Sequence, residues 1–305
     1  MLETRPDPVD LNARQSIDTA IVTILTGCQA ELVTTLRAAL DRPLPDQVHA
    51  LRVALRKLRA ALDIAARWAR SDSFDGVKGD AHDLASALGE ARDWDVLVTE
   101  TLPRHAAELA GIADLVPLLG AATGARDASY RRMLGSLDGP LPQKLLLGLA
   151  LLLSERRWRG SDGNLPPRLT GTTKAGAVRE LERAHRRQMR HGKRILALSD
   201  EARHRLRIDT KRLGYTIDFL GPVWTKPRKR LAYRRDVKRL QDVLGALCDT
   251  ETTHRLLDRI GSETISPEVH KAIGAILGWS ARDKRDQLAS IDRLWRAFRS
   301  AKPFW

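Results

Sequence analysis

Hydrophobic residues recur every three to four positions along most of the chain, which is the spacing of an α-helix with one buried face. Alternating hydrophobic and polar runs, which would indicate strands, are almost absent. In the first half the pattern predicts helices over residues 14–41, 46–70 and 74–92, with a fourth beginning near Asp93 or Asp95. Further helices follow, and breaks are expected at Pro103, Pro117 and residues 139–142.

A stretch rich in Gly, Pro, Ser and Thr runs from Gly160 to Thr173 and divides the chain almost in half. We interpret residues 161–173 as a linker between a first helical repeat, 14–160, and a second, 174–300. The second half is predicted to form helices over 174–198, 200–220, 228–247, 250–261 and 267–300. Short polar connections between such helices are typical of antiparallel bundles.

Two motifs occur once in each half, in the same order. The sequence HALRVALRKL begins at His49, and HRLRIDTKRL begins at His204, 155 residues later. Leu88-Gly89, followed by Asp93, corresponds to Leu244-Gly245, followed by Asp249, at an offset of 156. Two motifs at nearly the same offset indicate an internal duplication, and the chain as a whole is interpreted as one all-α domain.

Each copy of the first motif places leucines on one side of a helix and cations on another. In the first copy the cationic side carries His49, Arg52, Arg56 and Arg59, with no acid among them. Like charges at spacings of three and four residues destabilise a helix, so a partner outside the helix is expected. Arginine matches phosphate oxygens with paired donors, which favours a polyanion over a neighbouring acidic helix.

The corresponding cations of the second copy are His204, Arg207 and Lys211. Lys57 and Arg212 are expected at the rim of the same surface. A second, weaker basic line is expected where Lys78 and His82 align with Arg234 and Lys238. The helix before the second copy of the first motif adds a further set of cations, which includes Arg183 and Arg187. The glycines of the second motif are predicted to allow close helix approach, and Asp93 and Asp249 to cap the next helix.

The excess of positive over negative charge lies entirely in the second half of the chain. The formal net charge is +14, but residues 1–152 hold 17 Lys and Arg against 20 Asp and Glu, whereas residues 153–305 hold 35 against 18. Such a one-sided field is best explained by a polyanionic partner. The N-terminus lacks the pattern of a signal peptide, and no apolar run reaches the length of a membrane span, so a cytoplasmic location without a membrane span is expected.

Enzyme chemistry is not indicated. The two cysteines, Cys28 and Cys248, cannot build a disulfide framework or a cysteine-rich metal site. The sequence contains no phosphate-binding glycine loop, no zinc-protease motif and no serine nucleophile motif. His82-Asp83 spells the pair found in metal phosphohydrolases, but the other histidines do not complete a ligand set. No metal, no cofactor and no catalytic residue is therefore expected.

Non-specific nucleic-acid binding is the main alternative, because a basic groove would also attract DNA or RNA. Proteins that bind single strands usually interleave aromatic side chains on which the bases stack. The basic faces here carry almost none beyond Tyr215. Cations without a stacking surface favour a polymer of phosphate alone.

These residues resemble the CHAD family, the conserved histidine α-helical domain. The resemblance rests on the His49 and His204 motifs and on the two Leu-Gly-x-x-x-Asp motifs, and it covers about residues 14–300. It implies two pseudo-symmetric four-helix bundles around a basic central channel, non-catalytic binding of inorganic polyphosphate, and association with polyphosphate or storage granules in some members. The expected ligand-binding residues are His49, Arg52, Arg56, Lys57, Arg59, Lys78, His82, Arg183, Arg187, His204, Arg207, Lys211, Arg212, Arg234 and Lys238.

Overall fold

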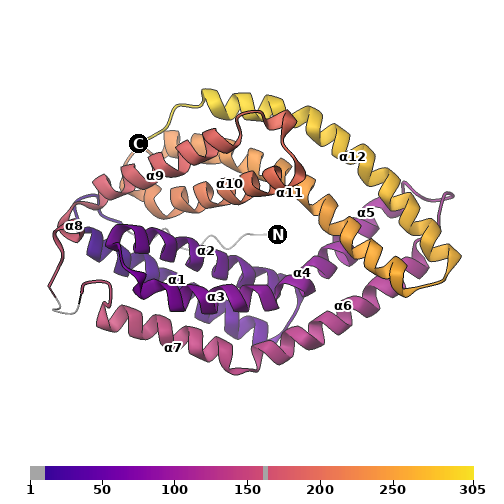
Figure 1. The fold of residues 1–305 in the computed structure, drawn as a ribbon, viewed down its shortest axis with the longest axis horizontal. Coiled ribbons are helices and arrows are strands. Elements are labelled where there is room, and N and C mark those ends of the chain that lie inside the picture. Colours follow the sequence, from indigo (N-terminus) through magenta and orange to yellow (C-terminus); the bar gives the residue numbers. More distant parts are fainter. Residues whose placement is uncertain (1–10, 161–163) are drawn as a thin grey trace.

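The computed structural model describes residues 11–160 and 164–305, so residues 161–163 of the predicted linker lie outside the described part. Within the described residues the chain is all-helical and forms no strand (Figure 1). The helices of the first half are α1 (Ile17–Asp41), α2 (Pro45–Ala69), α3 (Asp75–Ala87), α4 (Gly89–Val96), α5 (Leu102–Ala106), α6 (Val116–Leu137) and α7 (Pro140–Glu155). Those of the second half are α8 (Pro167–Thr170), α9 (Thr173–His191), α10 (Asp200–Leu220), α11 (Pro227–Glu263) and α12 (Pro267–Ser300).

Three predicted boundaries were wrong, and one of them is the end of the helix predicted over 174–198, since α9 ends at His191 before Gly192. The structure has one continuous helix, α11, where a break between residues 247 and 250 was expected. No glycine or proline lies at that point, and buried leucines such as Leu247 and Leu256 continue the apolar face across it. The helix predicted over 74–92 is instead divided at Leu88, where α3 ends and α4 begins. Asp93 therefore lies inside α4 and Asp249 inside α11, so neither caps a helix.

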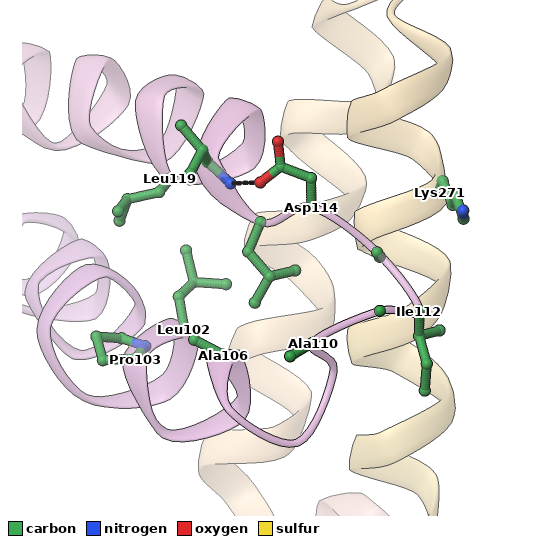
Figure 2. Close-up of a pocket in the computed structure, with 12 residues that line it drawn as sticks. Leu102, Pro103, Ala106, Ala110, Ile112, Asp114, Leu119 and Lys271 are labelled. Carbon is green, nitrogen blue, oxygen red and sulfur yellow. Dashed lines mark hydrogen bonds between the residues drawn. The ribbon is translucent and has the colours of Figure 1, made fainter.

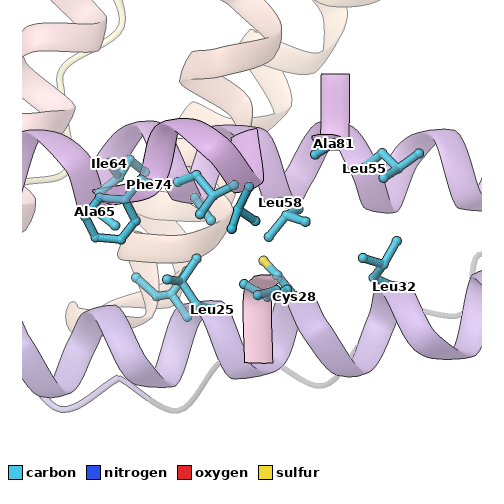
Figure 3. Packing of buried hydrophobic residues seen from close by; sticks show 14 of the residues in the cluster. Leu25, Cys28, Leu32, Leu55, Leu58, Ile64, Ala65, Phe74 and Ala81 are labelled. Atoms are coloured by element: carbon cyan, nitrogen blue, oxygen red, sulfur yellow. The ribbon is translucent and has the colours of Figure 1, made fainter. Parts of the chain in front are cut away.

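The buried hydrophobic residues form three clusters. The first joins α1, α2, α3 and α7, and Figure 3 shows Leu25, Cys28 and Leu32 of α1 facing Leu55 and Leu58 of α2. The second half has its own cluster, in which α9, α10 and the first part of α11 pack against the end of α12. These two clusters lie on opposite sides of the molecule in Figure 1.

The remaining cluster belongs to both halves of the chain. Trp94 of α4 and Leu118 of α6 pack with Leu257 near the end of α11 and Ile276 near the start of α12. In Figure 1 these four helices meet at the end of the molecule opposite α8 and α9. Because one core contains residues from both sides of residues 161–173, the two halves are held together by apolar burial as well as by the covalent connection.

The starts of α1 and α9 are also paired. Ser16 and Thr172 cap these helices through their side chains, and the two residues form an isolated antiparallel bridge. Ile17 N–H donates to the Gly171 carbonyl at 2.9 Å. The two capping residues are 156 positions apart, which is the offset of the second repeated motif. The described end of the predicted linker is therefore tied to the first helix by backbone hydrogen bonds.

Among the described helices, α1 alone is long and apolar enough to cross a membrane by length and composition. The same property is expected of a core helix, and Ile21, Leu25 and Leu32 of α1 are almost completely buried in the first cluster. The helix therefore gives only weak evidence for a membrane span.

Candidate functional site

The basic faces of α2 and α10 come together near the middle of the two helices. Arg56 of α2 and Lys211 of α10, which occupy the same position in the two copies of the motif, lie close enough for the charge of Arg56 to lower the pKa of Lys211. Arg207 acts on Lys211 in the same way, and Arg92 of α4 and Arg56 both act on Arg52. We call Arg52, Arg56, Arg92, Arg207 and Lys211 the central cation cluster.

Both repeated glycines lie beside an arginine of this cluster, and the first of them makes room for it. A Cβ atom at Gly89 would lie 3.2 Å from the Arg52 Nη1 atom, and one at Gly245 would lie 3.9 Å from Nη2 of Arg207. The predicted close approach is thus made by a guanidinium of the first motif against a glycine of the second. In both halves an arginine of the first motif lies beside the glycine of the second, but only the contact at Gly89 is closer than an ordinary van der Waals distance.

Three acids partly neutralise the cluster, and one of them is Glu100, which accepts a hydrogen bond from Arg92 at 2.7 Å. Arg207 donates to the Asp249 carboxylate at 2.9 Å, and Arg255 of α11 donates to Asp93 at 2.9 Å. Burial raises the pKa of Asp93, the charge of Asp249 adds to that increase, and Arg52 opposes it. The sequence pattern missed this compensation, because Asp93 and Asp249 come from α4 and α11, far along the chain from the helices that carry the cations.

Several donors of the cluster remain without a partner. The Nε atoms of Arg56 and Arg207 are buried and make no hydrogen bond. In the part of the chain that the structure describes, no acidic group lies within ion-pair distance of Arg52, Arg56 or Lys211, and the Arg52 guanidinium has only a long contact of 3.4 Å with the Ala85 carbonyl. Buried donors without acceptors are costly, so this arrangement is suited to an anionic ligand that supplies the missing oxygen atoms.

The two histidines lie in the second turn of α2 and of α10. His49 is close to the cluster: partial burial and then the charges of Arg92, Arg56 and Arg52 lower its pKa. It is therefore neutral at pH 7 in the free protein. His204 is exposed, and its ring makes no described hydrogen bond.

The second basic line is held by aspartates of the basic helices. Lys78 of α3 pairs with Asp63 of α2 at 2.9 Å, and Arg234 of α11 pairs with Asp218 of α10 at 2.7 Å. These two ion pairs occupy corresponding positions in the two halves. Lys238 pairs with Asp242 on its own helix, whereas His82 is exposed and makes no described side-chain contact.

The remaining predicted residues are divided among three places. Lys57 turns toward α1, where it pairs with Glu31 at 2.6 Å, and so lies away from the central cation cluster. Arg59 is half-buried on α2 without an acidic partner among the described residues. Arg183, Arg187 and Arg212 line a separate cleft between α2, α9 and α10.

Gly214 stands where the first copy of the motif has Arg59, and the structure shows what fills the space. The Arg234 guanidinium lies against it, 3.5 Å from where a Cβ atom would be. The cation that is absent from α10 is thus replaced by one from α11. This position also tolerates a methyl group, because 3.5 Å is an ordinary contact distance.

We expect Gly214→Ala to raise the free energy of unfolding by about 0.5–1 kcal/mol, since alanine in a helix interior loses less backbone entropy than glycine. Polyanion binding should stay unchanged, because the guanidinium of Arg234 need not move. Urea denaturation measures the first effect. A loss of stability would show that the Arg234 side chain cannot accept the added methyl group.

The lowered pKa of Lys211 predicts how anion binding depends on pH. Burial, followed by the charges of Arg207 and Arg56, lowers the pKa of Lys211 from 10.5 to about 8. Above pH 8 the free protein loses this charge, and an anion must restore it on binding. Affinity for a phosphate polymer should therefore fall about fivefold between pH 8 and pH 9, because the protonated fraction of Lys211 in the free protein falls from about one half to about one eleventh.

The folding stability should change in the opposite direction. Between pH 8 and 10.5 the unfolded chain holds a proton that the folded Lys211 has lost, so this group makes the folded state more stable as the pH rises. Binding and denaturation curves of the wild-type protein and of Lys211→Arg at both ends of this pH range test the expected fall in affinity and the expected rise in stability. An equally steep fall in affinity for the arginine variant would assign the pH dependence to another group.

An apolar pocket lies elsewhere and differs in character from the central cation cluster. It measures about 750 Å³ and is lined mainly by apolar residues of α5, the following loop and α6, including Leu102, Ile112 and Leu119, with Lys271 at one side (Figure 2). A single lysine cannot neutralise a polyanion, so the central cation cluster is the candidate site. No group of three metal-binding side chains was found among the described residues.

Comparison with known proteins agrees with this architecture. A crystal structure of the CHAD domain from the plant Ricinus communis matches with a TM-score of 0.80 at 22% identity, over 99% of this chain and 98% of the other. PptA from Streptomyces chartreusis matches with a TM-score of 0.66 at 15% identity, over 92% and 99%. No curated protein matches the sequence. The CHAD domain family itself matches residues 23–258, and the chain therefore belongs to the CHAD family.

Proposed function

We propose that the protein binds inorganic polyphosphate, without catalysing a reaction, at the central cation cluster. The observation that carries the proposal is that Arg52, Arg56 and Lys211, which come from both copies of one motif, are partly buried together and have no acidic partner among the described residues. Phosphate oxygens match arginine donors in paired geometry, and the release of counterions adds to the affinity.

The same proposal includes two pseudo-symmetric bundles around a basic channel. Three pairs of equivalent features support the symmetry: the capping residues Ser16 and Thr172, the Lys78 and Arg234 ion pairs, and the contact of each glycine with an arginine of the first motif. A two-fold relation would place Arg56 and Lys211 on either side of the axis, where one extended polymer reaches both.

A cytoplasmic location belongs to the proposal as well and rests on the sequence pattern, whereas association with polyphosphate or storage granules rests on the family resemblance. No metal or cofactor is required, because the cations of the chain supply the positive charge. Binding should depend on polymer length, since a longer chain brings more phosphates to the same cluster.

The experiment is a competition titration at about 0.15 M salt. Labelled long-chain polyphosphate is displaced by unlabelled polyphosphate, duplex DNA, single-stranded RNA or orthophosphate at equal phosphate concentration. At low competitor concentrations we expect only unlabelled polyphosphate to displace the labelled polymer. Equal displacement by DNA or RNA would contradict the proposal and would identify a general nucleic-acid surface instead.

A further inference from the structure

A second cationic cleft lies between α2, α9 and α10. It encloses about 120 Å³ and is lined by four arginines, Arg67 of α2, Arg183 and Arg187 of α9, and Arg212 of α10. Three acids, Asp63, Glu180 and Asp209, line the same space. Whether the cleft attracts an anion depends on which arginines these acids already neutralise.

Each of these acids lies closer to another group than to Arg183, Arg187 or Arg212. Glu180 pairs with Arg67 at 2.8 Å, which accounts for one arginine of the cleft. Asp63 lies 2.9 Å from the Lys78 ammonium but 3.9 Å from Arg212.

Asp209 is arranged in the same way. It contacts the His191 ring at 2.5 Å but lies 3.9 Å from Arg187, and 3.9 Å is too long for a hydrogen bond. Arg183 has no acidic partner among the described residues. Three guanidinium groups therefore face this space with hydrogen-bonding capacity left over.

In the first half of the chain the corresponding contact between two helices is an ion pair. At offsets of 155 and 156, Lys57 corresponds to Arg212 and Glu31 corresponds to Arg187. In the first half, Lys57 and Glu31 form a 2.6 Å ion pair across α1 and α2. In the second half Arg187 stands in the place of the glutamate, so the contact between α9 and α10 holds two cations instead of an ion pair.

We infer that this cleft is a second anion site, which takes one tetrahedral phosphate-type group between Arg183, Arg187 and Arg212. Arginine side chains on two helices offer paired donors to such a group from different directions. The group comes either from a small free anion such as pyrophosphate or from the end of a polyphosphate. Only the second source rests on the proposed function.

The decisive variant restores the charge pattern of the first half. Arg187→Glu should pair with Arg212 as Glu31 pairs with Lys57, and so should close the cleft without removing a core contact. Arg186→Glu is the matched control, because Arg186 is an exposed neighbour that does not line the cleft. Arg183→Gln is a second test that breaks no ion pair.

Binding of pyrophosphate to the full chain is measured by calorimetry, and binding of long-chain polyphosphate by fluorescence titration. We expect Arg187→Glu and Arg183→Gln each to weaken pyrophosphate binding at least tenfold, and Arg186→Glu to change it less than twofold. If only the pyrophosphate affinity falls, the site takes free anions. If the polyphosphate affinity falls in parallel, the cleft holds the end of the polymer.

Equal losses of pyrophosphate affinity for Arg187→Glu and Arg186→Glu would overturn the inference. It would also be overturned if the wild-type protein bound no pyrophosphate and both cleft variants bound polyphosphate as the wild type does. These outcomes are separate from failure of the proposed function. The proposed function would fail if substitutions in the central cation cluster left polyphosphate binding undiminished. The pyrophosphate comparison uses no variant of that cluster, so the two failures can be told apart.

Discussion

Reversing the charge of Arg207 and Lys211 together should lower the affinity for long-chain polyphosphate by more than 100-fold. A hydrogen bond to a charged group contributes about 1.5–3 kcal/mol, so the loss of two contacts removes at least about 3 kcal/mol. Since 1.4 kcal/mol corresponds to a factor of ten, two contacts alone give that ratio, and the introduced glutamates add repulsion. Fluorescence titration of the Arg207→Glu, Lys211→Glu variant measures the effect.

The matched control reverses Arg296 and Arg299 near the end of α12. Both are exposed and lie outside the central cation cluster, while the change in net charge is identical. We expect less than a fivefold loss for this control. The slope of log affinity against log salt should also fall by about two for the cluster variant. Equal losses for both variants would reduce the site to general surface charge.

Breaking the Arg207–Asp249 ion pair does not by itself account for such a loss. The milder variant Arg207→Gln, Lys211→Gln leaves no like charges facing Asp249 and should still bind at least tenfold more weakly. Helix content measured by circular dichroism should be unchanged in both variants, because Arg207 and Lys211 lie outside the apolar clusters.

The features predicted from the sequence are those encoded within one helix. The leucine and arginine faces of the His49 motif are set by spacings of three and four residues, so the basic side of α2 could be predicted without its neighbours. The repeat then predicted the matching face of α10. Arg56 and Lys211, which approach each other in the structure, are equivalent positions of that repeat.

The unpredicted features depend on partners far apart in the sequence. The Asp93–Arg255 contact spans 162 residues and the Arg207–Asp249 contact spans 42, so no local pattern indicated that the acids of the second motif face the cations. The continuity of α11 also depends on distant packing, because its last turns are buried against α4 and α6. Lys57 and Arg212 show the same limit: equivalent in sequence, they face different partners because Glu31 and Arg187 differ in charge.

The balance of acids and cations at the centre has a physical consequence. Asp249 holds Arg207 at 2.9 Å before any ligand is present, so a phosphate must share or replace that contact. The acids keep the cluster from destabilising the fold through repulsion among like charges. They also make a single phosphate a poor competitor, since one anion replaces a bond that already exists, whereas a polymer also reaches Arg52, Arg56 and Lys211.

The largest loss of stability is expected for Asp95→Ala, at about 3 kcal/mol in the free energy of unfolding. Asp95 is completely buried on α4 and accepts hydrogen bonds from Arg126 Nε at 2.7 Å and from the Tyr130 hydroxyl at 2.6 Å, both on α6. Removing the carboxylate leaves two donors without an acceptor and a guanidinium without its counter-charge. Chemical denaturation of the full chain measures the change.

The contact matters for the site because α4 carries Arg92 and Asp93 and is held to α6 at this point. Asp138→Ala, an exposed aspartate just after α6, is the control and should change the stability by less than about 0.5 kcal/mol. Tyr130→Phe removes one of the two hydrogen bonds and should cost about 1 kcal/mol. A loss below 1 kcal/mol for Asp95→Ala would mean that water replaces the carboxylate, and that the apolar packing of Trp94 and Leu118 alone fixes α4 against α6.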